Sequence, residues 1–190
     1  MAVFTMPAGE TEKKEEDLEK CLADIAAGEK AALARFYEQT YTAAYGLAVS
    51  ILQNRQDAED VVQDTYLKIW QAAGGYQKQG RPLAWLMTIV RNTARMRLRL
   101  TGRTVSVDGD TLWADEPAVS PEDRILLNSL LRQLGEEDRQ IVVLHALAGL
   151  KHREIAAMLG MSLPAVLSRY SRGMKKLRRA LKEADGHDES

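Results

Sequence analysis

The sequence predicts an all-α protein of two small helical lobes joined by a flexible acidic linker. Apolar side chains recur at three- and four-residue spacing through most of the chain, which is typical of amphipathic helices. No run of alternating β-branched residues, the usual signature of strands, is present. With 190 residues, 45% of them apolar and 28% charged, the chain is long enough to bury a core in each lobe.

The first lobe is predicted to span residues 15–100, after a loose acidic segment over residues 1–14. Helical periodicity defines its segments: one through Leu18, Leu22 and Ile25 to Gly28, then 29–53, 57–73, and from Pro82 into an arginine-rich stretch. Pro82 suits the first position of a helix, where its missing N–H costs nothing. Residues 74–82 contain glycine and proline and are predicted to form a loop.

Residues 101–120 interrupt the helical pattern with three aspartates, two glycines and a proline, and are assigned to the linker. A short hairpin around "VDGD" is an alternative there. The second lobe, 121–183, begins where Ser120 can cap a helix that Pro121 opens. Its predicted helices cover 122–134, 137–148, 151–159 and 163–184, and an acidic tail follows over 184–190.

Charge is distributed very unevenly along the chain, although the net charge is only −1. Residues 151–182 contain nine basic residues against one acid, and residues 91–103 contain five arginines and no acid. Residues 104–123 contain six acids and no base. Two basic blocks flanked by acidic ones indicate contact with a polyanion at two places.

The segment "HREIAAMLGMSLPAVLSRYSRGMKKL" (152–177) has the layout of a helix-turn-helix. Gly160 suits the turn, Ser162 can cap the second helix, and Pro164 falls in its first turn, where it is tolerated. Val166, Tyr170, Gly173 and Leu177 form one inward stripe. The DNA-facing candidates are therefore Ala165, Leu167, Ser168, Arg169, Arg172 and Lys176. A basic, solvated helix in an ordinary bundle is the alternative.

"DAEDVVQDTYLKIW" (57–70), "RPLAWLMTIVRNTARMRLR" (81–99), the acidic linker and the helix-turn-helix follow one another in this order. Together they resemble the small bacterial RNA polymerase sigma factors of the extracytoplasmic-function type, over about residues 18–182. The resemblance implies that the first lobe is a sigma region 2, which docks on core polymerase and recognises and melts the near promoter element. It implies that the second lobe is a sigma region 4, which reads the distant element.

The resemblance also suggests roles for residues of the first lobe. Core polymerase is expected to contact Asp60, Gln63 and Asp64, which share a helix face, with the aromatic side chains of Tyr66 and Trp70 as anchors. A solvated acidic face beside a core tryptophan is the alternative. The near-element DNA is expected to contact a loop and a basic ridge: Tyr76, Gln77, Lys78, Gln79 and Arg81, then Arg91, Asn92, Arg95 and Arg99. Trp85 is assigned to the core rather than to base stacking.

The chain departs from the family pattern at three places. Leu167 stands where relatives often have a basic residue, Pro164-Ala165 replaces a Gly-Thr pair, and Met96 replaces a polar or acidic residue. An outward leucine cannot bind phosphate, but it can pack on a thymine methyl group.

The expected partners are core RNA polymerase, promoter DNA and an anti-sigma factor, with no membrane insertion and no small-molecule substrate. No cofactor or metal is expected, and no catalytic motif is recognisable. We expect a cytoplasmic protein in which Cys21, the single cysteine, is buried. The linker acids either mimic nucleic acid inside the polymerase or form a plain tether. A stand-alone helix-turn-helix regulator that binds an operator is the alternative function.

Overall fold

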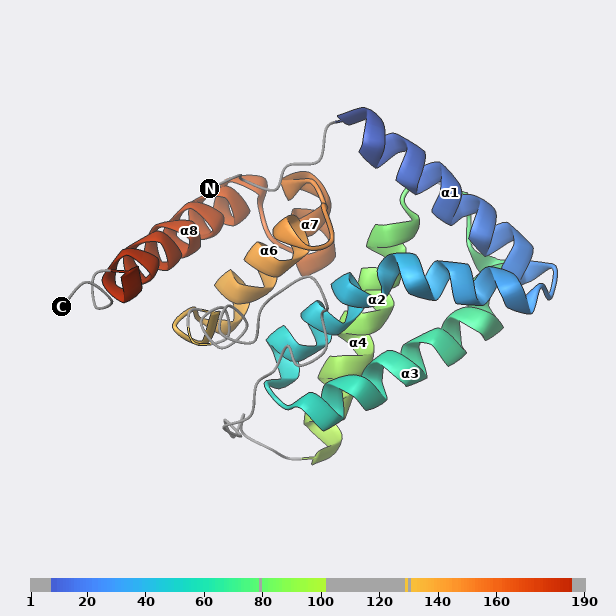
Figure 1. The fold of residues 1–190 in the computed structure, drawn as a ribbon, viewed down its shortest axis with the longest axis horizontal. Helices are drawn as coiled ribbons and strands as arrows, with labels where there is room; N and C mark the ends of the chain where they lie inside the picture. The colour runs from blue at the N-terminus through green and yellow to red at the C-terminus, as the bar shows by residue number, and fades with distance from the viewer. Residues whose placement is uncertain (1–7, 79, 102–128, 130, 186–190) are drawn as a thin grey trace.

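The computed structural model describes residues 8–78, 80–101, 129 and 131–185. Its elements are α1 (Ala8–Ala26), α2 (Lys30–Leu52), α3 (Arg55–Ala72), the short 3₁₀ helix η1 (Ala73–Gly75), α4 (Pro82–Thr101), α6 (Glu136–Ala146), α7 (His152–Leu159) and α8 (Leu163–Asp185) (Figure 1). The described ranges contain no strand, so the predicted all-α class is confirmed. None of these helices is both long and apolar enough to cross a bilayer.

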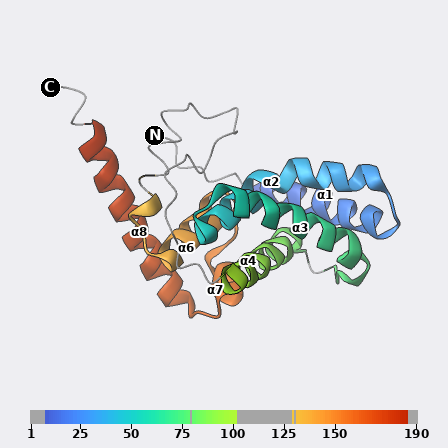
Figure 2. The same ribbon diagram turned by 90° about the horizontal axis from the view of Figure 1, so that it is seen from below.

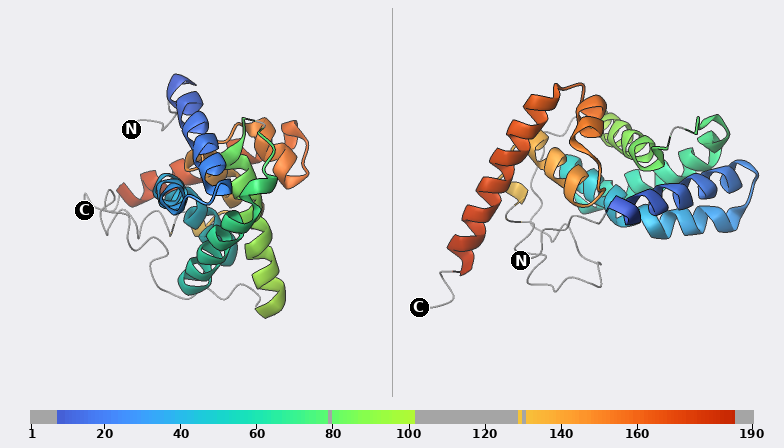
Figure 3. Two further views of the ribbon diagram at one scale, coloured as in Figure 1. Left: turned by 90° about the vertical axis from the view of Figure 1, so that its right-hand side faces the viewer. Right: turned by 90° about the horizontal axis from the view of Figure 1, so that it is seen from above.

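Helix α2 is the centre of the first lobe. Every residue from Ala43 to Leu52 is buried, because α1, α3 and α4 pack around α2 and α6 covers part of its remaining surface. The views in Figure 3 show α6 lying at the C-terminal end of α2. Phe36 and Leu86, both fully buried, anchor this core from α2 and α4.

Helix α1 begins at Ala8, inside the segment 1–14 that was expected to be loose. The Ala, Glu and Lys residues of this segment are strong helix formers, so the acidic composition was misleading there. The predicted stripe of Leu18, Leu22 and Ile25 is buried, as is Cys21.

Helix boundaries in the first lobe follow local chemistry. Asn54 caps α3, since its side chain accepts a hydrogen bond of 2.9 Å from the backbone N–H of Asp57. Helix α3 therefore starts slightly earlier than predicted. Pro82 opens α4, as expected.

The second lobe is built from α6, α7 and α8, and α8 extends well beyond its neighbours (Figure 2). Gly160 has a φ of 66° at the turn, and Ser162 Oγ accepts from the N–H of Ala165 at 3.4 Å. Val166 and Gly173 are buried against this core, so the predicted inward stripe is confirmed. The predicted linker beyond Thr101, the hairpin around "VDGD" and most of the predicted helix 122–134 lie outside the described residues.

Candidate nucleic-acid and protein interfaces

The exposed face of α3 carries the polar residues that were expected to bind a protein. Gln63 and Asp64 are exposed, and Asp60 is partly exposed. Leu67 lies one turn beyond Gln63 and is 63% exposed, which makes it the apolar side chain of this face. Sequence reasoning missed Leu67, although its spacing from Gln63 was the available signal.

Tyr66 cannot act as the predicted aromatic anchor, because it belongs to the core. Its hydroxyl lies 2.8 Å from Thr40 Oγ1, and its ring meets Phe36 edge-on at 6.4 Å between centroids. Burial raises the pKa of this phenol above its usual range. Trp70 is only partly buried against the same core, so an edge of its side chain can still be reached.

Asp60 already has a partner within the lobe. Arg97 of α4 donates to Asp60 Oδ2 at 2.7 Å and to Asp57 Oδ1 at 3.0 Å. The hydrogen bond with Asp57 is the main cause that raises the pKa of Arg97. This ion-pair network joins α3 to α4, so Asp60 helps to hold α3 in place.

The basic ridge of α4 is only partly as predicted. Asn92, Arg95 and Arg99 are exposed, with Met96 and Leu100 beside them. Arg91 is half-buried, and burial is the main cause that lowers the pKa of its guanidinium. Its Nε atom has no hydrogen-bond partner among the described residues. The freely accessible residues of the ridge are therefore Asn92, Arg95 and Arg99.

The loop after η1 is held by Glu19, a residue of α1 that sequence reasoning missed. Glu19 Oε1 accepts from the N–H of Gly80 at 2.6 Å and from the Tyr76 hydroxyl at 3.2 Å. Its other oxygen lies 3.7 Å from Lys78 Nζ. Gln77 is exposed, and Gln79 lies outside the described residues. One buried carboxylate thus fixes the shape of a loop that was predicted to contact DNA.

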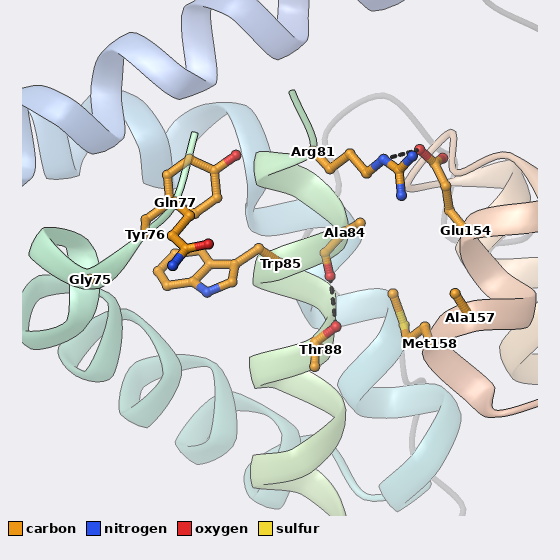
Figure 4. A pocket seen from close by; sticks show the side chains of 10 residues that line it. All are labelled: Gly75, Tyr76, Gln77, Arg81, Ala84, Trp85, Thr88, Glu154, Ala157 and Met158. Atoms are coloured by element: carbon orange, nitrogen blue, oxygen red, sulfur yellow. Dashed lines mark hydrogen bonds and ion pairs between the residues drawn. The ribbon is translucent and has the colours of Figure 1, made fainter. Parts of the chain in front are cut away.

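A cleft of about 500 Å³ opens between this loop, the start of α4 and helix α7 (Figure 4). Tyr76 and Trp85 line one side, with their ring centroids 5.2 Å apart. Ala157 and Met158 of α7 line the opposite side. Trp85 is partly buried, so it contributes both to the core and to the wall of a cleft whose flat groups suit a base.

Most of the predicted DNA-facing residues of α8 are accessible. Leu167, Ser168, Arg172 and Lys176 are exposed, and Ala165 is partly buried. Leu167 is 45% exposed, so its apolar side chain does lie at the surface.

Arg169 is the exception on α8, because it does not point freely outward. Its guanidinium forms ion pairs with Glu137 at 2.6 Å and Asp138 at 2.9 Å, both in the first turn of α6. The hydrogen bond with Asp138 is the main cause that raises the pKa of Arg169. Arg169 must leave these carboxylates before it can contact DNA.

A pair of histidines packs against the second helix of the helix-turn-helix. The rings of His145 and His152 stack with centroids 4.2 Å apart, and Tyr170 meets both of them edge-on. His145 Nδ1 lies 2.9 Å from the carbonyl oxygen of Leu150. Burial, followed by the nearby His145, lowers the pKa of His152. Acid conditions therefore oppose this packing.

Comparison with known proteins agrees with this geometry. Residues 36–104 match the family model of Sigma-70 region 2, and residues 124–177 match that of Sigma-70, region 4. The ECF RNA polymerase sigma factor SigK of Mycobacterium ulcerans (strain Agy99) is 30% identical over 178 residues, which cover 88% of this chain and 95% of the relative. SigK of Mycobacterium tuberculosis (strain H37Rv) is 28% identical over 175 residues, covering 87% and 94%.

Two solved structures share the fold. CnrH, in complex with the cytosolic domain of CnrY, superposes with a TM-score of 0.62 at 28% identity, covering 89% of this chain and 99% of that one. RpoE from Bartonella quintana, in complex with the anti-sigma factor NepR, gives a TM-score of 0.65 at 25% identity, covering 78% and 97%. The chain belongs to the ECF family of RNA polymerase sigma factors.

Proposed function

We propose that this ECF sigma factor binds core RNA polymerase through the exposed face of α3 and directs it to promoters through α4 and α8. The observation that carries the proposal is that α3, α4 and α8 each expose a separate accessible surface. The face of α3 is acidic and apolar, whereas α4 and α8 expose basic residues. A protein partner suits the first surface, and DNA phosphates suit the other two.

For polymerase docking we assign Gln63, Asp64 and Leu67 as direct contacts, with Trp70 at the edge of the surface. Asp60 both contacts the partner and positions α3 through its ion pair with Arg97. Leu67 replaces the buried Tyr66 as the apolar anchor. If Leu67 is a hot spot of the interface, its truncation costs about 2 kcal/mol or more, which corresponds to about 30-fold in affinity.

For the near promoter element we propose that the loop 76–81 and the cleft beside Trp85 receive an unstacked base, while Arg95 and Arg99 contact the backbone. Tyr76 and Trp85 offer flat faces for stacking, and Gln77 offers amide hydrogen bonds. Met96 and Leu100 lie among these arginines and would pack on exposed base or sugar surface.

For the distant element we propose that α8 lies in the major groove. Arg172 and Lys176 contact phosphate or guanine, Ser168 contacts a base edge or phosphate, and Leu167 packs on a thymine methyl group. The lobe boundaries 15–100 and 121–183, with a linker between them, are part of the same proposal.

We propose that an anti-sigma factor controls this protein. One structural neighbour, RpoE, was solved in complex with the anti-sigma factor NepR, and another, CnrH, in complex with the cytosolic domain of CnrY. The protein itself performs no catalysis and needs no cofactor in this account. It acts in the cytoplasm, where bacterial polymerase and DNA are found.

The docking assignment is tested by the triple variant Gln63→Ala/Asp64→Ala/Leu67→Ala in a binding titration with core polymerase. We expect core affinity to fall by more than about 30-fold while the circular dichroism spectrum stays unchanged. Glu16→Ala/Asp17→Ala, which removes exposed polar side chains from α1, is the matched control. Undiminished affinity of the triple variant would remove α3 from the interface.

A stand-alone regulator would behave differently, because it would bind duplex DNA with its full affinity in the absence of polymerase. Electrophoretic mobility shifts with and without core polymerase separate the two functions. We expect promoter-specific complexes only when polymerase is present.

A further inference from the structure

Two carboxylates of α1 hold the loop that precedes α4. Helix α1 packs against η1 and α4, and Glu15 and Glu19 lie one turn apart on it. Glu19 accepts from the N–H of Gly80 at 2.6 Å and from the Tyr76 hydroxyl at 3.2 Å. Glu15 accepts from the N–H of Leu83, in the first turn of α4. The chain between η1 and the start of α4 is therefore held to α1 at three points.

Glu19 is withdrawn from water to make these contacts, since its side chain is only 9% exposed. A buried carboxylate needs donors, and the loop supplies a backbone N–H, a phenol and, at 3.7 Å, the ammonium group of Lys78. Gly80 has a φ of 66°, in the left-handed region that glycine adopts without strain. The carboxylate and the loop therefore fix each other's conformation.

The contact with the hydroxyl group also orients the ring of Tyr76. This ring lies 5.2 Å from that of Trp85, and together they form the aromatic side of the cleft proposed above to receive an unstacked base. A phenol that is bonded at its far end has fewer orientations open to it than a free one. Glu19 is not among the described residues that line the cleft, so it acts on the cleft only through Tyr76 and the loop.

The charge of Glu19 alone would have the opposite effect on DNA. An acid beside a DNA-binding loop repels phosphate and weakens binding. Glu19 also precedes residues 36–104, the part of the chain that matches Sigma-70 region 2. An acid that positions the loop and an acid that merely repels DNA therefore predict opposite signs when the side chain is removed.

We propose that Glu19 is a positioning residue for base capture, which holds the loop and Tyr76 in the conformation that accepts an unstacked base. The proposal rests on the base-capture role assigned above and adds α1 to it. Because the loop is already ordered in the free protein, DNA does not have to order it on binding. A loop that is ordered only about a tenth of the time would bind the base about tenfold more weakly.

The first test uses holoenzymes formed with wild type, Glu19→Ala or Glu16→Ala. Each is equilibrated with a pool of random 12-nucleotide single strands, the bound strands are sequenced, and core polymerase alone gives the background. Glu16 is exposed on α1, so its variant removes an equal charge without touching the loop. We expect wild type and Glu16→Ala to enrich a shared motif and Glu19→Ala to enrich it about tenfold less. Undiminished or increased enrichment by Glu19→Ala would overturn the proposal.

Glu19→Gln separates the hydrogen bonds of this residue from its charge. The amide oxygen of glutamine can still accept from Gly80 and Tyr76, but the side chain is neutral. We expect Glu19→Gln to restore most of the enrichment that Glu19→Ala loses. A Glu19→Gln holoenzyme that behaves like Glu19→Ala would show that the charge is responsible, and the positioning role would be wrong.

Tyr76→Phe tests the route by which Glu19 acts, because it keeps the ring and removes only the hydroxyl group. We expect a smaller loss of enrichment than in Glu19→Ala, and the losses in the double variant should not add, since both changes remove one contact. Fully additive losses would contradict this route. Circular dichroism and core affinity should stay unchanged. If Glu19→Ala loses helical signal, Tyr76→Phe decides, and its undiminished enrichment overturns the proposal.

The same measurements separate this inference from the proposed function. A wild-type holoenzyme that enriches a motif equally well with and without the Glu19 side chain refutes the role of Glu19 alone. A wild-type holoenzyme that enriches no motif beyond core polymerase refutes base capture. A chain that never assembles with core polymerase refutes the proposed function.

Discussion

The two lobes use their arginine side chains in different ways. In the first lobe, Arg97 joins α3 to α4 through Asp57 and Asp60, so its ion pairs lie within the lobe and position α3. In the second lobe, Arg139 donates across the interface to α2. The arginine of the first lobe thus links helices of that lobe, whereas the arginine of the second lobe links α6 to α2, beside apolar side chains of both lobes.

The largest expected effect is on the stability of the first lobe. Phe36→Ala removes a fully buried ring at the centre of the first lobe and should lower the free energy of unfolding by about 3–5 kcal/mol. Urea denaturation followed by tryptophan fluorescence measures this loss, since Trp70 and Trp85 both pack against the core. A loss below about 1 kcal/mol would mean that the core of α2 is not the main support of the lobe.

The next effect distinguishes the face of α8 that we propose to bind DNA from the face of α3 that we propose to bind polymerase. Arg172→Ala should weaken promoter binding by the holoenzyme by about 1–3 kcal/mol, with assembly on core polymerase unchanged. Leu167→Ala should reduce binding only at promoters with a thymine at the contacted position. Leu167→Arg should instead steepen the salt dependence by about one phosphate contact. Loss of assembly in Arg172→Ala would show that α8 does not face DNA.

The stability of the two lobes is expected to change in opposite directions as the pH is varied. Burial, followed by the charge of Glu154 across the lobe interface, raises the pKa of Glu15 to about 7. Its stabilising contribution is complete below the unfolded pKa near 4.5 and is lost as the pH rises through about 7. The pKa of His152 is lowered, so the second lobe loses stability as the pH falls below the unfolded value of about 6.5.

Glu15→Gln should therefore reduce the loss of lobe docking between pH 6 and pH 8, as measured by scattering. Glu19 and Lys14 also act on Glu15, and the N–H of Leu83 donates to its carboxylate. His152→Gln should leave the pH dependence of lobe docking unchanged. It should reduce the fall in the free energy of unfolding at acid pH. If lobe docking depends on pH in the same way in Glu15→Gln and in wild type, then Glu15 is not the group whose titration controls it.

The smallest effect tests packing between α6 and α8. A Cβ atom at Gly173 would lie 3.2 Å from Val142 Cγ2, which is tight but can be relieved by a small shift. Alanine gains about 1 kcal/mol of helix propensity over glycine, so Gly173→Ala should change stability by less than about 1 kcal/mol. In a Val142→Ala background the same change should be stabilising. A double-mutant cycle by thermal unfolding measures the difference.

Sequence patterns predicted the helices well where apolar spacing, caps and turns agree. Pro82, Gly160 and Ser162 all lie where local chemistry placed them. The start of α1 was wrong because acidic composition was given more weight than helix propensity. The exposed faces of α3 and α8 were also predicted in outline.

Contacts between distant segments could not be read from spacing. Tyr66 is buried because Thr40 and Phe36 of another helix lie against it. Arg169 is paired with the first turn of α6, and Glu19 holds a loop far along the chain. Arg139 gave no sequence signal, since two of its partners are backbone carbonyl groups and the third is the side-chain amide of Gln53 on another helix end.

We expect this chain to combine polymerase docking on its first lobe with promoter reading on both lobes. Run-off transcription with core polymerase and a promoter library tests it most directly, with wild type, the α3 triple and Arg172→Ala compared at equal concentration. We predict transcripts from wild type, none from the α3 triple for lack of assembly, and an assembled but weakly initiating Arg172→Ala holoenzyme. Transcripts from the α3 triple at the wild-type level, or no transcripts from wild type at any promoter, would contradict the account.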